Sequence, residues 1–344
     1  MYNKNLGGMI MKISTRFKKL TVGFIMAIAL TTSVTGLAAK TQGVKLEGLA
    51  KQEYVLKKMD AFFRPTADNK ITPQPFVVPQ GYTYTKGEIN GSKYERLVPK
   101  KKQTDNVVLQ LHGGGYVLPL RDGHRKLGII QSELAGNAEV IYVDYRVAPK
   151  DRHPAALEDA VNVYSEMLRQ GYKAKNIIVI GDSAGGNLAI TLSLYLRDHN
   201  IAQPGMLVMI SPWGTVENTL PSRVYNFNKD LVLGKGASPL TKEITNASYG
   251  EGSDFKAPYL SPLYAEDFVN LPPMLIQTGS YEVLMDDGAL LAQRAKDAGV
   301  KVQYTNYQEM PHDFALMLPD LQDSIDSWEE IRNFIKQIKS KRAA

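Results

Sequence analysis

The chain has 344 residues, of which 44% are apolar and 22% charged, as in a globular protein with a sizeable core. Its net charge of +6 does not indicate a nucleic-acid partner, because residues 1–39 hold five basic and no acidic side chains and the remainder holds 36 basic against 35 acidic residues. The chain contains no cysteine, which excludes disulfides, thiolate metal sites and cysteine nucleophiles.

The first 39 residues predict a signal peptide. Residues 12–19 are basic, and residues 20–30 form an apolar run of the length of a signal-peptide core, shorter than a usual membrane span. Gly36 and Ala38 form a small-x-small pattern that can direct cleavage before Ala39. The alternatives are an uncleaved anchor and a buried helix. We expect a secreted or cell-surface protein whose only membrane contact is through this segment.

A helical and an irregular segment precede a regular alternation of strands and helices. Residues 45–64 predict an amphipathic helix, because apolar side chains recur at helical spacing. Residues 65–105 are rich in Pro, Gly, Thr and Lys and predict irregular chain with short antiparallel strands. From residue 106 onward, continuous apolar runs predict buried strands at 106–112, 139–145, 176–182, 205–211, 273–280 and 302–307.

Helical patterns separate these strands. One helix is expected to begin at Pro154, a favoured first helical residue, and to end at Gly171. The alternation predicts an α/β fold with a mainly parallel sheet. Residues 212–272 break the rhythm, and such an insertion lies above the carboxyl ends of the strands, where ligands bind. We expect residues 40–344 to form one domain, with a cap built from about 45–64 and 212–272.

The segment Gly-Asp-Ser-Ala-Gly at 181–185 follows a predicted strand and precedes a predicted helix. A serine at such a turn is the nucleophile elbow of serine hydrolases, in which small neighbours leave room for a strained serine backbone. This setting predicts Ser183 as a nucleophile at the start of a helix, where the helix dipole favours negative charge. The alternative is an ordinary Gly-rich turn with a helix-capping serine.

Three consecutive glycines, Gly113, Gly114 and Gly115, follow the predicted strand 106–112. Successive glycines let backbone N–H groups turn towards one point, which is what the oxyanion of a tetrahedral intermediate requires. Two of these amides and that of Ala184 are the expected oxyanion hole. A phosphate-binding loop is the alternative, but its usual Lys-Ser/Thr sequel is absent here.

His312 is the expected base. In α/β-hydrolases the chain order is Ser, acid, His, and His199 would lie about 24 Å from the elbow along the intervening helix. Glu282 is the first carboxylate after the strand 273–280 and is the expected acid partner, with Asp286 as the alternative. The remaining histidines precede the serine in sequence and are not expected to act as the base: His112, His124 and His153.

With these motifs the chain resembles the hormone-sensitive lipase family of α/β-hydrolases, the bacterial family IV esterases. The resemblance covers roughly residues 106–335, and its landmarks include LHGGGY, DYRVAP, HPAALEDA, GDSAGGN and PHDF. It implies a central sheet of about eight strands, a helical cap and cofactor-free, metal-free ester hydrolysis. The catalytic roles fall on Ser183, Glu282 and His312, and the oxyanion role falls on Gly113, Gly114, Gly115 and Ala184.

Two positions depart from the family pattern. Many members have Asp-Pro-Leu where this chain has Glu282-Val283-Leu284, and many have His-Gly-Phe where it has His312-Asp313-Phe314. Asp313 adds a carboxylate beside the expected base, and such a charge raises the pKa of a histidine.

The expected substrate is a small ester with a short acyl chain. An amidase, lactonase or peptidase would use the same groups, and a binding module without catalysis is a further alternative. Aromatic side chains are candidate pocket walls, with core packing as the equal alternative: Tyr116, Trp213, Tyr225, Phe227, Tyr249 and Tyr281. The sequence leaves the oligomeric state open, a homodimer included.

Overall fold

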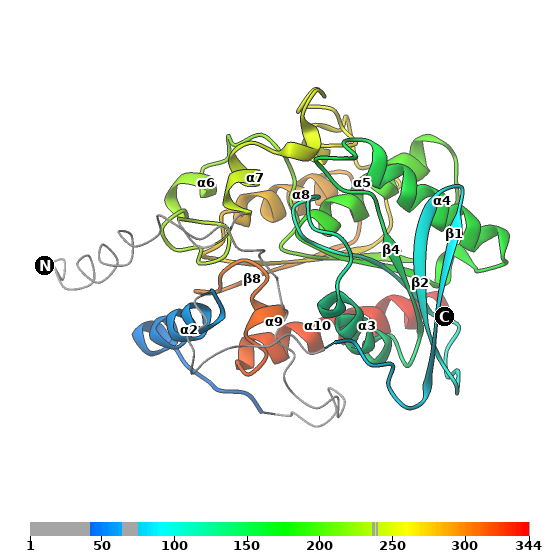
Figure 1. The fold of residues 1–344 in the computed structure, drawn as a ribbon, viewed down its shortest axis with the longest axis horizontal. Helices are drawn as coiled ribbons and strands as arrows, with labels where there is room; N and C mark the ends of the chain where they lie inside the picture. The colour runs from blue at the N-terminus through cyan, green and yellow to red at the C-terminus, as the bar shows by residue number, and fades with distance from the viewer. Residues whose placement is uncertain (1–41, 64–74, 236–237, 239, 344) are drawn as a thin grey trace, which may run out of the picture.

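The computed structural model describes residues 42–63, 75–235, 238 and 240–343 (Figure 1). The predicted signal peptide lies outside these residues. Within the part of the chain that is described, no helix has the length and apolar character needed to cross a membrane.

One eight-stranded sheet forms the centre of the molecule, in the spatial order β1-β2-β4-β3-β5-β6-β7-β8. The pairs β1–β2 and β2–β4 are antiparallel, and every other pair is parallel. The strands are β1 (Tyr82–Ile89), β2 (Ser92–Pro99), β3 (Val107–Leu111), β4 (Glu139–Asp144), β5 (Ile177–Asp182), β6 (Met206–Ile210), β7 (Met274–Gly279) and β8 (Val302–Tyr307).

The predicted α/β fold with a mostly parallel sheet is confirmed. All six predicted strands are present, but β8 is an edge strand and is half-buried along its whole length, so the expectation that 302–307 is buried is wrong. The antiparallel β1 and β2 fall within the segment 65–105. Every residue of β3, β5, β6 and β7 is buried, whereas exposed and half-buried residues alternate through most of the edge strand β1. Strands covered on both faces need apolar side chains on both faces, which explains their continuous apolar sequences.

Helices cover both faces of the sheet (Figure 1). The helices α4 (Ala155–Arg169), α5 (Ala184–Asp198) and α8 (Met285–Asp297) lie on one face. On the other face lie α3 (Asp122–Leu134), α9 (Phe314–Met317) and α10 (Gln322–Ala343). The helix α4 matches the one predicted from Pro154, which is its N-cap residue.

In the part of the insertion 212–272 that is described, the helical pieces are all short. They are α6 (Ser222–Tyr225), α7 (Thr241–Thr245), η4 (Ser248–Gly250) and η5 (Pro262–Tyr264). A further single turn, η3 (Ala174–Asn176), precedes β5. In Figure 1, α6 and α7 lie on the α8 side of the sheet at the end opposite β1.

The helix α2 (Gly48–Phe63) matches the predicted helix at 45–64 and lies in Figure 1 on the other side of the sheet, close to α9. Lys51 Nζ lies 2.7 Å from Asp323 Oδ1, and Gln52 Nε2 donates to Glu309 Oε1 at 2.6 Å. These contacts place α2 beside α10 and the turn that leads to residue 312. That α2 belongs to a cap stays a prediction.

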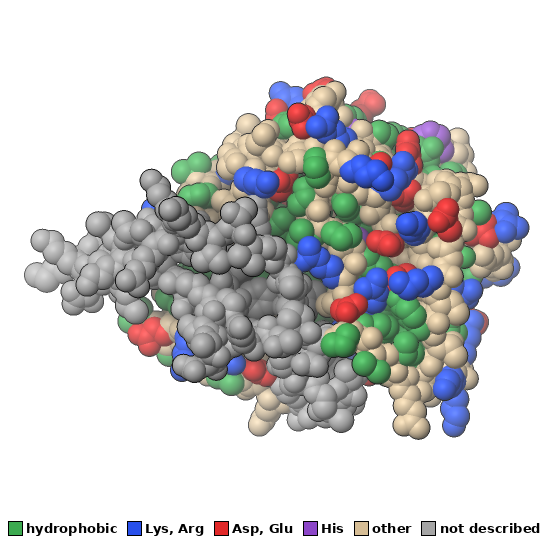
Figure 2. Space-filling model, in the orientation of Figure 1, with side chains coloured by type: hydrophobic (Ala, Val, Ile, Leu, Met, Phe, Trp, Pro, Cys, Tyr) green, Lys and Arg blue, Asp and Glu red, His purple; other side chains and the backbone are tan. Residues whose placement is uncertain are grey.

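The visible face in Figure 2 carries interspersed basic and acidic side chains, without a large patch of either sign on the part not drawn in grey. This distribution agrees with the near-neutral balance of the chain after residue 39. The visible part of this face has no basic patch of the kind that attracts a polyanion.

Candidate active site

Ser183 lies at the turn between β5 and α5 with φ at 54°, in a conformation that side chains rarely adopt. Its amide donates to the carbonyl of Ile210 at 2.9 Å. A Cβ atom at position 185 would lie 2.0 Å from the carbonyl oxygen of Leu111, and one at position 181 would lie 2.2 Å from that of Gly185. Two glycines are therefore a steric requirement of this turn, which is the elbow predicted from the sequence.

The structure brings Ser183, His312 and Glu282 into one row. The Ser183 hydroxyl lies 3.0 Å from His312 Nε2, and His312 Nδ1 lies 2.9 Å from Glu282 Oε2. The other carboxylate oxygen of Glu282 accepts the amide of Gly279 at 2.9 Å, which fixes its orientation. All three side chains are buried, with 6% of Ser183 exposed. The row has the geometry of a nucleophile, a base and a group that orients the base.

Burial and neighbouring charges determine the ionisation of this row. Burial raises the pKa of Glu282 to about 7, against the lowering effect of its hydrogen bond with His312. Burial by itself lowers the pKa of His312, but the carboxylates of Asp313 and Glu282 outweigh it and raise that pKa well above its ordinary value. Both effects follow from placing an imidazole among carboxylates in an environment with little water.

The glycine loop lies next to the serine, as predicted for an oxyanion hole. Gly114 and Gly115 have φ at 117° and 62°, which glycine adopts without a steric cost. Ala184 is the first residue of α5, where an amide has no acceptor within the helix. The amide of Gly113 donates to the buried carboxylate of Asp182. The candidate donors to an oxyanion are therefore the amides of Gly114, Gly115 and Ala184.

The cavity beside Ser183 is narrow, with a volume of about 20 Å³. A space of this size holds about one water molecule. None of the aromatic candidates lines it, and Tyr116, Trp213 and Tyr249 are buried core residues. Its walls are Gly113, Gly114, His124, Asp182, Ser183, Leu240, His312, Asp313, Leu316 and Met317. Leu240 belongs to the insertion, which therefore contributes to the site as expected of a cap element.

The other histidines take no part in the row. The His112 ring stacks on Tyr145 with centroids 4.0 Å apart, and its Nδ1 lies 2.8 Å from the carbonyl oxygen of Gly113. Burial lowers the pKa of His112 to about 4, so its ring is neutral and supports the glycine loop. His199 ends α5, and His153 precedes α4. Within the described residues no cluster of histidine and carboxylate side chains suits a metal ion.

Asn187 connects three parts of the site from the second turn of α5. Its Oδ1 accepts the Tyr116 hydroxyl at 2.6 Å, and its Nδ2 donates to the carbonyl of Trp213 at 2.6 Å. The same Nδ2 donates to the carbonyl of Leu260 at 3.1 Å. One buried amide thus joins the glycine loop, the helix after the elbow and the insertion.

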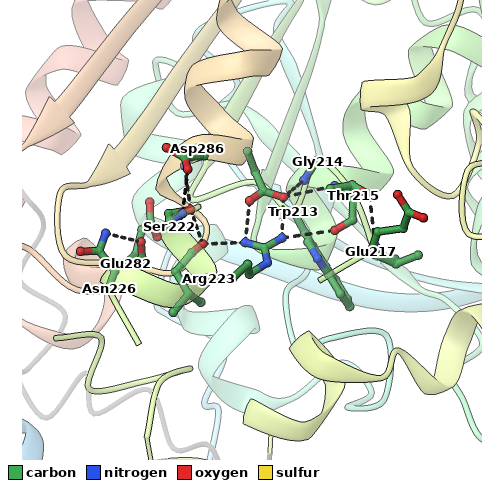
Figure 3. Close-up of polar contacts among 12 residues, drawn as sticks. Trp213, Gly214, Thr215, Glu217, Ser222, Arg223, Asn226, Glu282 and Asp286 are labelled. Atoms are coloured by element: carbon green, nitrogen blue, oxygen red, sulfur yellow. Dashed lines mark hydrogen bonds and ion pairs between the residues drawn. The ribbon is translucent and has the colours of Figure 1, made fainter. Parts of the chain in front are cut away.

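Side chains of the insertion hold the loop that carries Glu282 (Figure 3). Arg223 and Asp287 form a buried ion pair with atoms 2.6 Å apart, and Arg223 also donates to the carbonyl of Val283 at 2.6 Å. Asp230 accepts the amide of Val283 at 2.8 Å, and Asn226 donates to the carbonyl of Glu282 at 2.9 Å. The peptide groups next to Glu282 are therefore fixed from the insertion.

Asp286, the alternative candidate for the acid, is hydrogen-bonded to the helix α6. It accepts the amide of Ser222 at 2.7 Å (Figure 3). It also accepts the hydroxyl of Tyr225, likewise from α6, at 3.0 Å. Asp286 and Asp287 lie in the first turn of α8. Arg223, Asn226 and Asp230 were missed by the sequence analysis, because an irregular segment has no periodicity that reveals which side chains point inward.

Comparisons with known proteins agree with this fold. Residues 108–316 match a family described as alpha/beta hydrolase fold. An acetyl-hydrolase of Streptomyces hygroscopicus is 35% identical over 235 residues, which span 68% of this chain and 75% of that protein. An esterase of Acinetobacter venetianus is 35% identical over 213 residues, which span 61% of this chain and 68% of that protein.

A solved structure described as an esterase from the bacterial hormone-sensitive lipase family superposes with a TM-score of 0.72 at 30% identity. The superposition covers 85% of this chain and 99% of that one. The fold of the described residues is thus shared with an esterase of that family over nearly the whole length of the solved chain.

Replacing Asn187 with Ala should lower the free energy of unfolding by at least about 2 kcal/mol, because it leaves the Tyr116 hydroxyl and the Trp213 carbonyl buried without this partner. Urea denaturation of the two proteins measures the difference. Asn246→Ala, at an exposed position of the insertion, is the control and should change stability by less than about 0.5 kcal/mol. Equal stability of the two variants would contradict the connecting role of Asn187.

Proposed function

The chain belongs to the α/β-hydrolase family, and from this premise we propose that it hydrolyses carboxylic esters with short acyl chains. The observation that carries the proposal is the row of Ser183, His312 and Glu282, with contacts of 3.0 and 2.9 Å. The names of its relatives, which include an acetyl-hydrolase, an esterase and an ethyl acetate hydrolase, support an ester substrate.

The proposed reaction has two steps through an acyl-enzyme. His312 Nε2 accepts the proton of Ser183 as Oγ bonds to the ester carbonyl carbon, and the carbonyl oxygen becomes an oxyanion. The amides of Gly114, Gly115 and Ala184 would hold that oxyanion. His312 then gives its proton to the leaving alcohol as the C–O bond breaks, and water repeats the sequence in reverse to release the acid. Glu282 orients the imidazole and stabilises its cationic form.

The size of the cavity supports a short acyl chain. Beside Ser183 the space is only about 20 Å³, and the apolar side chains of Leu240, Leu316 and Met317 bound it. Because the space holds only about one water molecule, any acyl group displaces part of these side chains, and the displacement is smallest for a short chain. An amidase, lactonase or peptidase would use the same row, and the ester-hydrolase relatives favour the ester over these alternatives.

Replacing Ser183 with Ala should lower kcat/KM for p-nitrophenyl acetate by about 10⁴-fold or more, because the nucleophile is lost. Hydrolysis of p-nitrophenyl esters from acetate to palmitate measures both the loss and the chain-length preference, which should peak at short chains. Ser340→Ala, at an exposed position of α10, is the matched control. Activity retained by the Ser183 variant would exclude the mechanism, and a peak at palmitate would exclude the substrate class.

The assignment of the acid is tested by two variants that each replace a carboxylate by an amide of equal size. Glu282→Gln should lower kcat by about 10⁴-fold, because the amide cannot stabilise the imidazolium in the same way. Asp286→Asn should retain kcat within about tenfold, because its partners belong to α6 and not to the row. The reverse order of the two effects would assign the acid role to Asp286.

We also propose that the protein is exported and that residues 1–39 direct this export. The basic segment 12–19 followed by the apolar run 20–30 supports it. Expression of the full chain in a bacterial host should yield a protein outside the cytoplasm whose N-terminus, measured by mass spectrometry, lies near Ala39. A variant without residues 12–30 should stay in the cytoplasm. An intact N-terminus in the membrane fraction would instead indicate an anchor.

A further inference from the structure

Asp313 contacts the same atom of the base as the nucleophile does. Its Oδ2 lies 3.1 Å from His312 Nε2, and the Ser183 hydroxyl lies 3.0 Å from that nitrogen. A neutral imidazole whose Nδ1 bears its proton has a lone pair at Nε2, which accepts from a hydroxyl and repels a carboxylate oxygen. An imidazolium has a proton at Nε2 and donates to a carboxylate. The carboxylate of Asp313 therefore favours the charged form of His312.

Asp313 holds this position at a structural cost. Its backbone adopts the left-handed conformation, with φ at 51° and ψ at 33°, which glycine adopts more readily. Its Oδ1 is buried and, among the described residues, has no hydrogen-bond partner. A buried carboxylate oxygen without a partner is destabilising. The contact of Oδ2 with His312 and the donation of the Asp313 amide to Ser211 Oγ at 3.2 Å are stabilising interactions that oppose these costs.

Four carboxylates face His312 from the elements packed around it. Glu282 comes from the loop after β7, Asp182 from the end of β5, Asp230 from the insertion, and Asp313 from the residue that follows the histidine. Burial, followed by the charge of Asp313, raises the pKa of Asp182 to about 8. Among these groups, Glu282 contacts Nδ1 and Asp313 contacts Nε2, the atom that exchanges protons with Ser183.

We propose that Asp313 sets the pH range of the reaction by holding His312 in its imidazolium form, a role that rests on the ester hydrolysis proposed above. At low pH, Nε2–H of His312 donates to Asp313, and no lone pair is free to accept the Ser183 proton. As the pH rises, Nε2 releases this proton to water and the base becomes active.

The same contact assists the reaction once it has begun. When the Ser183 proton moves to Nε2 during attack on the ester, the imidazolium forms again, and Asp313 stabilises the new positive charge. The effect of Asp313 on the reaction rate therefore has opposite signs at low and at high pH. Asp313 suppresses activity at low pH, and it raises the rate at high pH, where His312 starts neutral.

Two variants test this role. Asp313→Asn removes the charge at nearly constant volume and tolerates the left-handed backbone, and Asp313→Gly removes the side chain and suits that backbone. In both, the midpoint of the acid limb of kcat/KM for p-nitrophenyl acetate should fall by about one pH unit or more, because the charge that raises the pKa of His312 is lost. The rate on the alkaline plateau should fall as well. Asp297→Asn, at the exposed end of α8, should change neither.

An unchanged midpoint in both variants, with activity lost equally at every pH, would reduce Asp313 to a structural residue and overturn the proposal. A second experiment distinguishes a wrong role for Asp313 from a wrong assignment of ester hydrolysis. Ser183 is sulfonylated with phenylmethylsulfonyl fluoride across the same pH range, and the label is measured by mass spectrometry. Labelling and hydrolysis by the wild type, with no shift in the variants, overturns only the role of Asp313. A wild type that neither hydrolyses the ester nor is labelled overturns both.

Discussion

The strained turn at Ser183 is the constraint on which the rest of the site depends. A serine with positive φ directs its hydroxyl out of the sheet, but the turn closes only where the chain passes very near its neighbours. The Cβ positions at 181 and 185 would fall within 2.2 and 2.0 Å of backbone oxygens. The chain tolerates the turn because β5 lies between β3 and β6 and the Ser183 amide donates to Ile210 at the end of β6. The sheet thus stabilises a conformation that the local sequence would not adopt alone.

The second requirement is the stabilisation of buried charge. Glu282 and Asp313 contact the two ring nitrogens of His312 at 2.9 and 3.1 Å, and all three side chains are almost unexposed. An ion in such a place is stable only when it is paired or hydrogen-bonded. The insertion supplies much of this support through Arg223 and Asp230, which bond the peptide groups beside Glu282. The segment 212–272 therefore does more than bound the cavity, because it also holds the loop that carries Glu282.

The sequence predicted the parts of the site that depend on local pattern. The six predicted strands begin and end within one residue of the predicted bounds. Continuous apolar runs mark the strands covered on both faces, whereas β8, which was expected to be buried, is a half-buried edge strand. The elbow and the row of Ser183, His312 and Glu282 followed from a motif in its strand-turn-helix context and from chain order. These features require only short segments or their sequence order.

Contacts across long separations could not be predicted in this way. Arg223 meets Asp287 across 64 residues, from a segment without periodicity. None of the aromatic residues considered as pocket walls lines the cavity. Tyr116, Trp213 and Tyr249 pack in the core and Tyr225 is exposed, and aromatic character alone does not tell a cavity wall from either. The actual apolar walls, Leu240, Leu316 and Met317, come from the insertion and from α9. The contact between Asp313 and Nε2 depends on a side-chain direction that only the fold determines.

The central claim is that Ser183 is activated by the buried row, and covalent labelling tests it most directly. The wild-type protein would be treated with a fluorophosphonate probe and digested, and the modified peptide would be identified by mass spectrometry. The account predicts one label on Ser183, little or no label in Ser183→Ala, and much slower labelling in Glu282→Gln. An unlabelled wild type, or a label on another serine, would contradict it.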